Sequence, residues 1–166
     1  MIIEDENTLN DKDKKFITEE LLGNKVPFYW HNSQAHKDNK PFLSHILINR
    51  ETQQIHSEYA EFFKDITRRF CKKHNLPCNV FLRGNINLTF PIEGRGTLHR
   101  DHSFSYYQII IYLNQSEGGS TVIVADKATK TIEPKQFKII GFDGDFLHYQ
   151  TYPKSGRRLI AVMTFI

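Results

Sequence analysis

Two residues with metal-binding side chains stand close together past the middle of the sequence. His99 and Asp101 are separated by one residue, so in an extended segment both side chains leave the same face of the chain. An imidazole and a carboxylate on one face could hold a metal ion together. The tripeptide alone is a weak signal, because a surface histidine beside a turn-forming aspartate is the more ordinary explanation. The prediction of a metal site therefore depends on the rest of the sequence.

A histidine and an arginine later in the chain supply that context. His148 lies in the β-rich run 146–150, and Arg158 stands ten residues further on, at the start of the last apolar run. Two neutral imidazoles and one carboxylate on one side of a metal ion leave the opposite positions open, which is typical of the non-haem Fe(II) oxygenases. An arginine beside such a site offers a planar, permanently charged fork for a dicarboxylate. His99, Asp101 and His148 are therefore candidate ligands of one metal ion.

The elements that must position these residues are predicted to be short strands. After Pro77 the chain changes to β-rich runs that are separated by turns, without helical patterns between them. About seven such strands favour an antiparallel sandwich or a jelly roll. The predicted strands are residues 80–82, 85–90, 106–113, 121–125, 137–142, 146–150 and 158–166.

The part before Pro77 is predicted to be mainly helical. Apolar residues recur at helical spacing over residues 55–70, which predicts the longest helix, and residues 13–22 predict a shorter one. The run 26–30 predicts a strand, and the acidic, polar residues 1–10 predict a frayed terminus. We therefore expect an α+β protein with helices first and a double sheet after them.

Length and composition limit the possible classes of protein. A chain of 166 residues with 39% hydrophobic residues fits a single domain with a substantial core. We expect one domain over residues 1–166, with a helical part at about 11–76 and a jelly-roll core at about 80–166. Cys71 and Cys78 are not spaced as a redox or metal pair and predict two reduced thiols. No apolar run is long enough for a membrane span and no secretory leader is visible, so we expect a cytoplasmic location and no membrane partner.

The net charge of the chain does not by itself identify a binding partner. The net charge of +3 at neutral pH indicates mild basicity, without the long basic tract of a nucleic-acid-binding protein. One basic cluster ends the longest predicted helix. It could bind phosphate, but cations that complement the C-terminal end of a helix are the simpler explanation. The members of this basic cluster are Arg68, Arg69, Lys72, Lys73 and His74.

From residue 80 to the end, the sequence resembles the Fe(II)- and 2-oxoglutarate-dependent dioxygenases, especially their prolyl-hydroxylase-like branch. Each element of the resemblance is common, but their order and spacing together are specific. The elements are His99-x-Asp101, Ile111-Tyr112-Leu113-Asn114, Gly118-Gly119-Ser120-Thr121, Ile132-Glu133-Pro134-Lys135, Phe142, His148 and Gly156-Arg157-Arg158. The resemblance implies a double-stranded β-helix, or jelly roll, with N-terminal supporting helices, which agrees with the strands predicted above.

The resemblance also implies roles for individual residues. His99, Asp101 and His148 would be the iron ligands. Arg158 would pair with the distal carboxylate of 2-oxoglutarate. Arg157 is the competing residue, because only one of two successive strand residues can face the pocket.

Other residues have weaker support. Tyr112 matches a tyrosine that hydrogen-bonds the cosubstrate carboxylate in some relatives, but it could equally be one more aromatic residue on a buried strand. Thr121 and Asn87 could line the same cavity. His102 is interpreted as a residue that supports the ligands or faces solvent, rather than as a fourth ligand. One position departs from the family pattern, since many relatives carry Ser or Thr two residues after the arginine and this chain has Ile160.

The activity implied by the resemblance is the hydroxylation of a substrate by O2 and 2-oxoglutarate, with succinate and CO2 as co-products. The hypothesis is a 2-oxoglutarate/Fe(II)-dependent dioxygenase that hydroxylates a side chain in a protein or peptide. Fe(II) is the expected cofactor and 2-oxoglutarate the expected cosubstrate, with ascorbate as a further candidate. One alternative is a non-catalytic jelly-roll module that binds metal. Another is an oxygenase that acts on a small molecule or on nucleic acid, in which case the basic cluster would contact phosphate.

Specificity in such folds resides in the loops around the mouth of the pocket. For this chain we expect those loops at residues 31–42, 87–98, 102–106 and 126–131.

Overall fold

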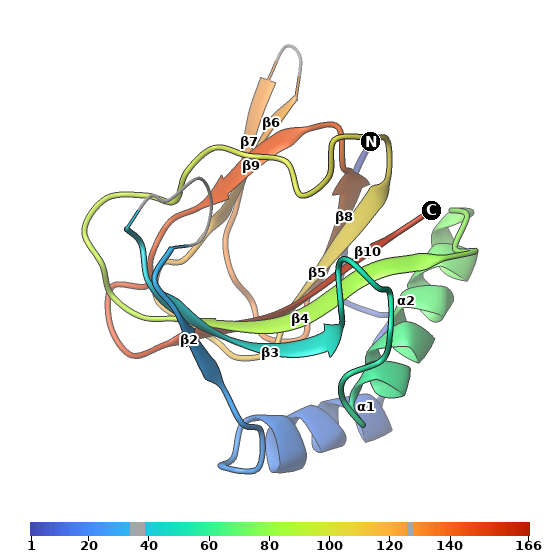
Figure 1. Cartoon of the computed structure of the whole chain (residues 1–166), viewed down its shortest axis with the longest axis horizontal. Coiled ribbons are helices and arrows are strands. Elements are labelled where there is room, and N and C mark those ends of the chain that lie inside the picture. Colours follow the sequence, from blue (N-terminus) through green and yellow to red (C-terminus); the bar gives the residue numbers. More distant parts are fainter. Residues whose placement is uncertain (34–38, 126–127) are drawn as a thin grey trace.

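The computed structural model of the chain describes residues 1–33, 39–125 and 128–166. Parts of two expected specificity loops, residues 34–38 and 126–127, lie outside the described residues. Two antiparallel sheets and a helical layer make up the described fold (Figure 1). The helical elements are α1 (Asp11–Phe16), the π-helical turn η1 (Ile17–Leu21) and α2 (Ala60–His74). The strands are β1 (Ile2–Asp5), β2 (Tyr29–His31), β3 (Phe42–Ile48), β4 (Phe81–Thr89), β5 (Tyr107–Tyr112), β6 (Thr121–Ala125), β7 (Ala128–Ile132), β8 (Ile139–Asp143), β9 (Leu147–Gln150) and β10 (Arg158–Phe165).

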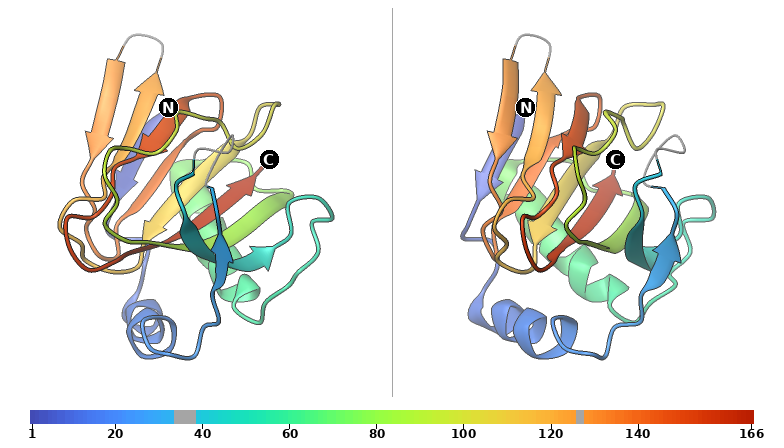
Figure 2. Two further views of the ribbon diagram at one scale, coloured as in Figure 1. Left: turned by 60° about the vertical axis from the view of Figure 1, so that its left-hand side comes forward. Right: turned by 90° about the vertical axis from the view of Figure 1, so that its left-hand side faces the viewer.

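The two sheets differ in size and in strand order. The larger sheet has the order β1-β8-β5-β10-β4-β3-β2, and the smaller sheet has the order β7-β6-β9. Neighbours that are far apart in the sequence, such as β4 and β10, are the mark of a jelly roll. The predicted fold class, an α+β jelly roll with N-terminal supporting helices, is therefore confirmed. Figure 2 shows the smaller sheet lying over one part of the larger sheet, with the β6–β7 hairpin projecting beyond it.

Period-two alternation along the central strands builds a core on each face of the larger sheet. On β5, Ile109 and Ile111 belong to the core beneath the helices, whereas Ile110 and Tyr112 belong to the core between the sheets. Successive strand side chains point to opposite faces, which produces this division. β10 is buried along its whole length because both of its faces are covered. The central strands thus carry one row of side chains toward the space between the sheets, where the site lies.

Helix α2 covers the outer face of the larger sheet. Its apolar residues Phe63, Ile66 and Phe70 are fully buried, and burial of each such side chain contributes about 1.5–3 kcal/mol. The chain passes close to Phe70 at Gly141 of β8, where an added Cβ would lie 2.6 Å from the phenyl ring. The helix and the sheet are therefore in close contact at Gly141, where a larger residue does not fit.

The structure corrects several predicted elements. Residues 1–10 were expected to form a frayed terminus, but Ile2–Asp5 pairs with β8 as an edge strand. The buried carboxylate of Asp5 accepts hydrogen bonds from Lys73 and His74 of α2, at 2.7 and 2.6 Å. These contacts explain why an acidic segment can be ordered. They also engage part of the predicted basic cluster.

Other differences concern strands. β3 and β7 were not predicted, and the two short runs at 80–82 and 85–90 form the single strand β4. The part before Pro77 contributes β1, β2 and β3 to the larger sheet in addition to the helices. The division into a helical part at 11–76 and a core at 80–166 remains a prediction. Among the described residues, no helix has the length and apolar character needed to cross a membrane.

Candidate active site

His99, Asp101 and His148 lie together, although the sequence separates them by up to 49 residues. His99 and Asp101 are in the segment between β4 and β5, and His148 is on β9. Reciprocal backbone hydrogen bonds join His99 and His148, with N···O distances of 3.0 and 2.9 Å. One possible ligand atom from each of the three residues can be chosen so that all lie within 4.8 Å of one another. This spacing fits a single metal ion.

Backbone carbonyls fix the tautomers of both imidazoles. Nδ1 of His99 lies 2.7 Å from the carbonyl oxygen of Thr97, and Nδ1 of His148 lies 3.4 Å from that of Phe146. A carbonyl oxygen can only accept, so Nδ1 carries the proton in each ring and donates it. Nε2 then carries the lone pair in each ring, as a metal ligand must, and at His148 the amide nitrogen of Gln108 lies 3.4 Å from this atom.

The two carboxylate oxygens of Asp101 have different surroundings. Oδ1 accepts hydrogen bonds from Arg83 and from Arg50, the second at 2.9 Å, whereas Oδ2 lies 3.7 Å from Nε2 of His148. The backbone N–H of Asp101 donates to the hydroxyl of Tyr106 at 2.8 Å. These contacts hold the side chain so that Oδ2 faces the histidines and is available to a cation.

The ionisation states of Asp101 and His99 suit metal binding. Burial by itself raises the pKa of Asp101, but the charge of Arg83 and the interactions with His148 outweigh burial and hold this pKa well below its usual value. Burial, together with the neighbouring His148, lowers the pKa of His99. Near neutral pH the site therefore offers an ionised carboxylate and neutral imidazole, which are the protonation states that metal binding requires.

Arg158 is a buried cation that has only neutral hydrogen-bond partners. Its guanidinium donates to the carbonyl of Gly119 at 2.6 Å, to Oε1 of Gln150 at 2.7 Å and to Oγ1 of Thr121 at 3.0 Å. Its exposed fraction is 2%, and burial lowers its pKa. Within the described residues no carboxylate forms an ion pair with it. A buried charge without a counter-ion is costly, so this guanidinium is suited to an anionic ligand.

Glycine makes room for this arginine. Gly119 has φ +83°, and an added Cβ would lie 2.7 Å from Cδ of Arg158. The neighbouring Arg157 faces away from the site, is exposed and donates to the carbonyl of Leu22 at 2.9 Å. Of the two adjacent arginines, Arg158 is the one that lines the pocket.

Tyr112 lies behind the pocket wall rather than on it. Its hydroxyl donates to Oγ1 of Thr121 at 2.7 Å, and its ring centroid is 5.6 Å from the guanidinium carbon of Arg158. Oγ1 of Thr121 thus accepts from both residues, which leaves the hydroxyl proton of Thr121 to be donated elsewhere. In this structure, a contact of Tyr112 with a pocket ligand would run through Thr121.

One pocket of about 340 Å³ contains both the candidate metal ligands and Arg158. Three of its polar residues, Asn87, Thr89 and Gln108, each have a buried side-chain oxygen without a hydrogen-bond partner. Such atoms are uncommon in folded proteins and indicate a site that a ligand or water completes. The pocket is lined by Phe42, Arg50, Arg83, Asn87, Thr89, Gly96, His99, Arg100, Asp101, Gln108, Ile110, Thr121, His148, Tyr149, Gln150, Arg158, Ile160 and Val162.

His102 does not line this pocket. Its Nε2 lies 2.9 Å from the hydroxyl of Thr164, and its ring packs against Tyr106 with a centroid separation of 4.7 Å. Tyr106 also contacts the backbone of Asp101. His102 therefore lies next to the candidate ligands but is not one of them.

Sequence reasoning missed Arg83 and Arg50, the two partners of Asp101. A signal for Arg83 was present, because Arg83, Asn85, Asn87 and Thr89 alternate along a strand with apolar or small residues. Such a polar row on one face of a buried strand indicates a lined cavity. Arg50 lies in the turn after β3, where no pattern marked it.

Comparison with known proteins gives the fold a family context. No family model and no curated protein matches the sequence. A solved oxidoreductase of the 2OG-Fe(II) oxygenase family from Burkholderia pseudomallei superposes with a TM-score of 0.81 at 13% identity, covering 99% of this chain and 84% of that one. A prolyl-4-hydroxylase from Pseudomonas putida gives 0.64 at 13% identity, covering 99% and 91%.

A third solved structure is the prolyl hydroxylase of Trichoplax adhaerens, in complex with a peptide fragment of the hypoxia inducible factor oxygen degradation domain. It superposes with a TM-score of 0.69 at 12% identity, covering 99% of this chain and 83% of that one. The described chain thus has the fold of the 2OG-Fe(II) oxygenases, prolyl hydroxylases among them. The resemblance inferred from the sequence is confirmed at the level of the fold.

Proposed function

We propose that this protein is an Fe(II)- and 2-oxoglutarate-dependent dioxygenase that hydroxylates a side chain in a protein or peptide, with succinate and CO2 as co-products. The observation that carries the proposal is that one pocket contains a His-Asp-His cluster and a buried arginine for which the described residues supply no counter-ion. A metal site alone would fit many functions. A metal site that shares its pocket with an unpaired buried cation fits a metal-chelating dicarboxylate.

The residues present fit Fe(II). His99 and His148 would bind it through Nε2, and Asp101 through Oδ2, since the other carboxylate oxygen is held by Arg83 and Arg50. Three protein ligands on one side leave the remaining coordination positions for other groups. When bound, Fe(II) and 2-oxoglutarate supply the oxidising chemistry with O2.

The residues also fit 2-oxoglutarate. The distal carboxylate would supply a counter-ion that Arg158 does not have among the described residues, and the hydroxyl proton of Thr121 can be donated to it. Charge-assisted hydrogen bonds of this kind contribute about 1.5–3 kcal/mol each. Tyr112 would act as a positioning residue, because its hydroxyl holds Thr121. Ile110, Ile160 and Val162 give the pocket an apolar wall that limits access of water.

The first test uses thermal shifts with redox-inert Mn(II). We expect Mn(II) to raise the melting temperature of the protein, and 2-oxoglutarate to raise it further only when Mn(II) is present. Arg158→Gln should keep the Mn(II) shift and lose the 2-oxoglutarate shift. Arg157→Gln is the matched control, because it removes an adjacent arginine that faces away from the pocket, and it should behave as wild type. A wild-type protein that responds to neither addition contradicts the proposal.

A second candidate function, a metal-binding module without catalysis, makes a different prediction in the same experiment. It predicts a metal shift without any dependence on 2-oxoglutarate. Succinate production by the Fe(II)-loaded protein, measured with candidate peptides, then separates an enzyme from a module.

Action on nucleic acid has less support than action on a peptide. The basic cluster is on α2, which packs on the face of the larger sheet opposite the pocket. Several of its members have acidic partners, since Arg69 pairs with Asp13 at 2.9 Å and Lys73 with Asp5 at 2.7 Å. A peptide substrate is favoured by analogy with the peptide complex described above. The use of ascorbate and a cytoplasmic location remain predictions.

A further inference from the structure

We call the part of the pocket around His99, Asp101 and His148 the candidate metal end. The positive charge of its described residues exceeds their negative charge. Arg50, Arg83 and Arg100 line it, and Asp101 is the one carboxylate among the described residues of the lining. Arg50 and Arg83 converge on a single oxygen of Asp101. A divalent cation on the other oxygen would add further positive charge. The described residues thus leave an excess of positive charge at this end, which favours an anionic group there.

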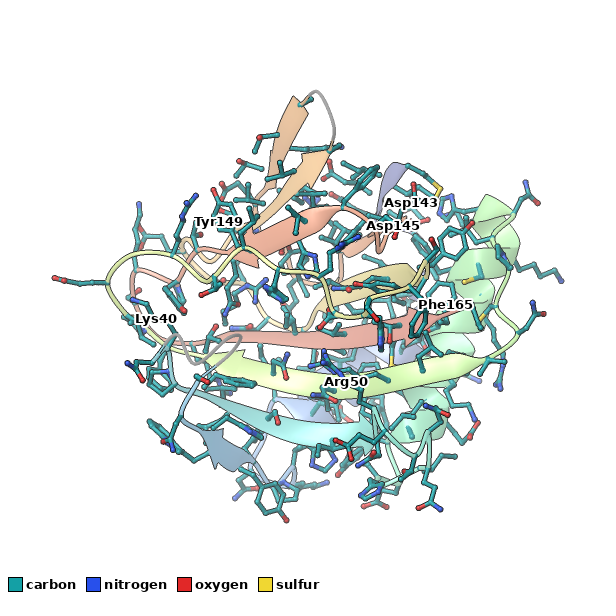
Figure 3. The ribbon with its side chains drawn as sticks, turned by 45° about the horizontal axis from the view of Figure 1, so that its top comes forward. Lys40, Arg50, Asp143, Asp145, Tyr149 and Phe165 are labelled. Atoms are coloured by element: carbon teal, nitrogen blue, oxygen red, sulfur yellow. The ribbon has the colours of Figure 1, made fainter. Side chains whose placement is uncertain are left out.

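The three arginines are not equivalent. Arg83 is held on β4, with a side chain that is 14% exposed and donates to Asp101. The side chain of Arg50 is 47% exposed and reaches Asp101 from the turn after β3. Arg50 shares its acceptor, Oδ1 of Asp101, with Arg83. Its positive charge is therefore only partly balanced, and it has further N–H groups that can donate to another acceptor. Figure 3 shows Arg50 on the side of the larger sheet and Tyr149 on the side of the smaller sheet, and both residues line the pocket.

Arg100 is a second positively charged residue of the pocket lining that can bind a further anionic group. Its nearest acid is Asp145, at an N···O distance of 3.9 Å, and both side chains are about half exposed. That distance is too long for a hydrogen bond, and exposed pairs contribute little. Arg50 and Arg100 therefore both line the pocket with guanidinium groups that the described residues leave incompletely satisfied.

We propose that Arg50, with Arg100, binds a carboxylate of the substrate, so that the substrate is an acidic compound whose carboxylate lies beside the carbon that is hydroxylated. This inference rests on the proposed function and names its substrate class. The planar fork of arginine matches a carboxylate. The carboxylate could belong to an acidic residue of a peptide or to a small organic acid, and the two arms of the experiment distinguish these sources.

The position of these arginines separates the two anions of the reaction. Among the described residues Arg158 has only neutral hydrogen-bond partners, which suits the cosubstrate. Arg50 contacts Asp101 directly, and Arg100 lines the same pocket. A substrate held there by its carboxylate would present the neighbouring carbon to the metal-facing side of the pocket.

The first arm measures fluorescence anisotropy with two labelled pools of degenerate peptides that have a central Pro. One pool carries Asp and Glu near the Pro, and the matched pool carries Asn and Gln. With protein that is loaded with Mn(II) and 2-oxoglutarate, we expect the acidic pool to bind at least about tenfold more tightly. Arg50→Gln should remove most of this preference, Arg50→Lys should restore part of it, and Arg157→Gln should leave it unchanged.

The second arm measures thermal shifts of the loaded protein with small carboxylic acids and their amides. A shift that depends on the carboxylate and is lost in Arg50→Gln, without discrimination between the peptide pools, supports the proposal with a small acid as substrate. The inference is overturned if neither arm discriminates acid from amide, or if Arg50→Gln discriminates as wild type does.

Failure of this inference can be told apart from failure of the proposed function. The thermal shifts of the wild-type protein with Mn(II) and 2-oxoglutarate test the proposed function by themselves, without any Arg50 variant. A wild-type protein that shows those shifts but no acid preference disproves the substrate class alone. A protein that prefers acids but responds to neither Mn(II) nor 2-oxoglutarate disproves the proposed function instead.

Discussion

The two ends of the pocket use arginine in opposite ways. At one end Arg158 is buried and contacts only neutral acceptors. At the other end Arg83 and Arg50 converge on the carboxylate of Asp101. An unpaired buried cation is costly to the folded protein, whereas a cation with a carboxylate partner is stabilised by it. Among the described residues, the Arg158 end thus lacks a counter-ion, whereas Oδ2 of Asp101 at the other end is not held by either arginine.

The largest expected effect comes from removing the charge of Asp101. Asp101→Asn should abolish the Mn(II) thermal shift and reduce succinate production to background, because a neutral amide oxygen is a poor replacement for a carboxylate ligand. It should also destabilise the metal-free protein by about 3 kcal/mol, since Arg83 then loses the acceptor that balances its charge. Chemical unfolding and metal titration measure the two effects.

His102→Gln is the control for this prediction. His102 stands next to Asp101 in the sequence but does not line the pocket, so the variant should keep its response to Mn(II). An Asp101→Asn protein with a wild-type Mn(II) response would show that this end of the pocket is not a metal site.

The second prediction concerns the opposite end and uses a matched pair of glycines. Gly119 and Gly156 both have positive φ, at +83° and +65°, so alanine strains the backbone at either position by about 1 kcal/mol. Only at Gly119 would the new Cβ meet Arg158, and no atom lies within 4 Å of a Cβ at Gly156. Gly119→Ala should therefore raise the KM for 2-oxoglutarate about tenfold or more. Gly156→Ala should lower stability with little change in that KM.

Equal KM values for the two glycine variants would show that the position of Arg158 does not matter for the cosubstrate. The difference between the arginines at the two ends of the pocket would then have no effect on the binding of the cosubstrate.

Much of the fold was predictable, because hydrophobic periodicity is a local property of the sequence. The β-rich run at 106–113 and the helical spacing that ends at Phe70 both correspond to elements of the structure. The N-terminal strand was not predictable in this way. Ile2–Asp5 is ordered by pairing with β8 and by the contacts of Asp5 with α2, and both depend on residues more than sixty positions away.

The site was predictable only where its residues carry chemistry by type. His99, Asp101 and His148 stand out as metal-binding residue types, and the structure brings them within reach of one ion. Arg50 is one of many arginines, and nothing in the sequence shows that its turn returns to Asp101. Tyr112 was expected at the cosubstrate, yet its hydroxyl donates to Thr121, and Thr121 rather than Tyr112 lines the pocket. Its role with the cosubstrate remains a prediction.

A smaller effect is expected from pH. The pKa of His99 is lowered by burial and by His148 from its usual value of 6.5, and burial also lowers that of His102. The unfolded chain therefore binds protons before the folded one, so stability is full above about pH 6.5 and is lost as the pH falls toward the lowered values. We expect a loss on the order of 1 kcal/mol for the metal-free protein.

Urea unfolding between pH 7 and pH 5 measures this loss. His99→Gln should reduce the slope without removing it, since His102 still titrates. A slope that is identical in the variant would mean that His99 is not desolvated, and that the candidate metal end is more open to water than the structure places it.

The smallest effect sharpens the distinction between Arg83 and Arg50. Asp101 retains Arg83 when Arg50 is removed, and the Arg50 side chain is 47% exposed, so Arg50→Gln should change the free energy of unfolding by less than about 1 kcal/mol. Arg83 is 14% exposed, and Arg83→Gln should cost more, about 2 kcal/mol, because Asp101 is then left with a solvent-screened partner. Urea unfolding of the metal-free proteins at low and moderate salt measures both values. If Arg50→Gln were the more damaging change, Arg50 would be committed to holding Asp101 and would have no charge to offer a substrate.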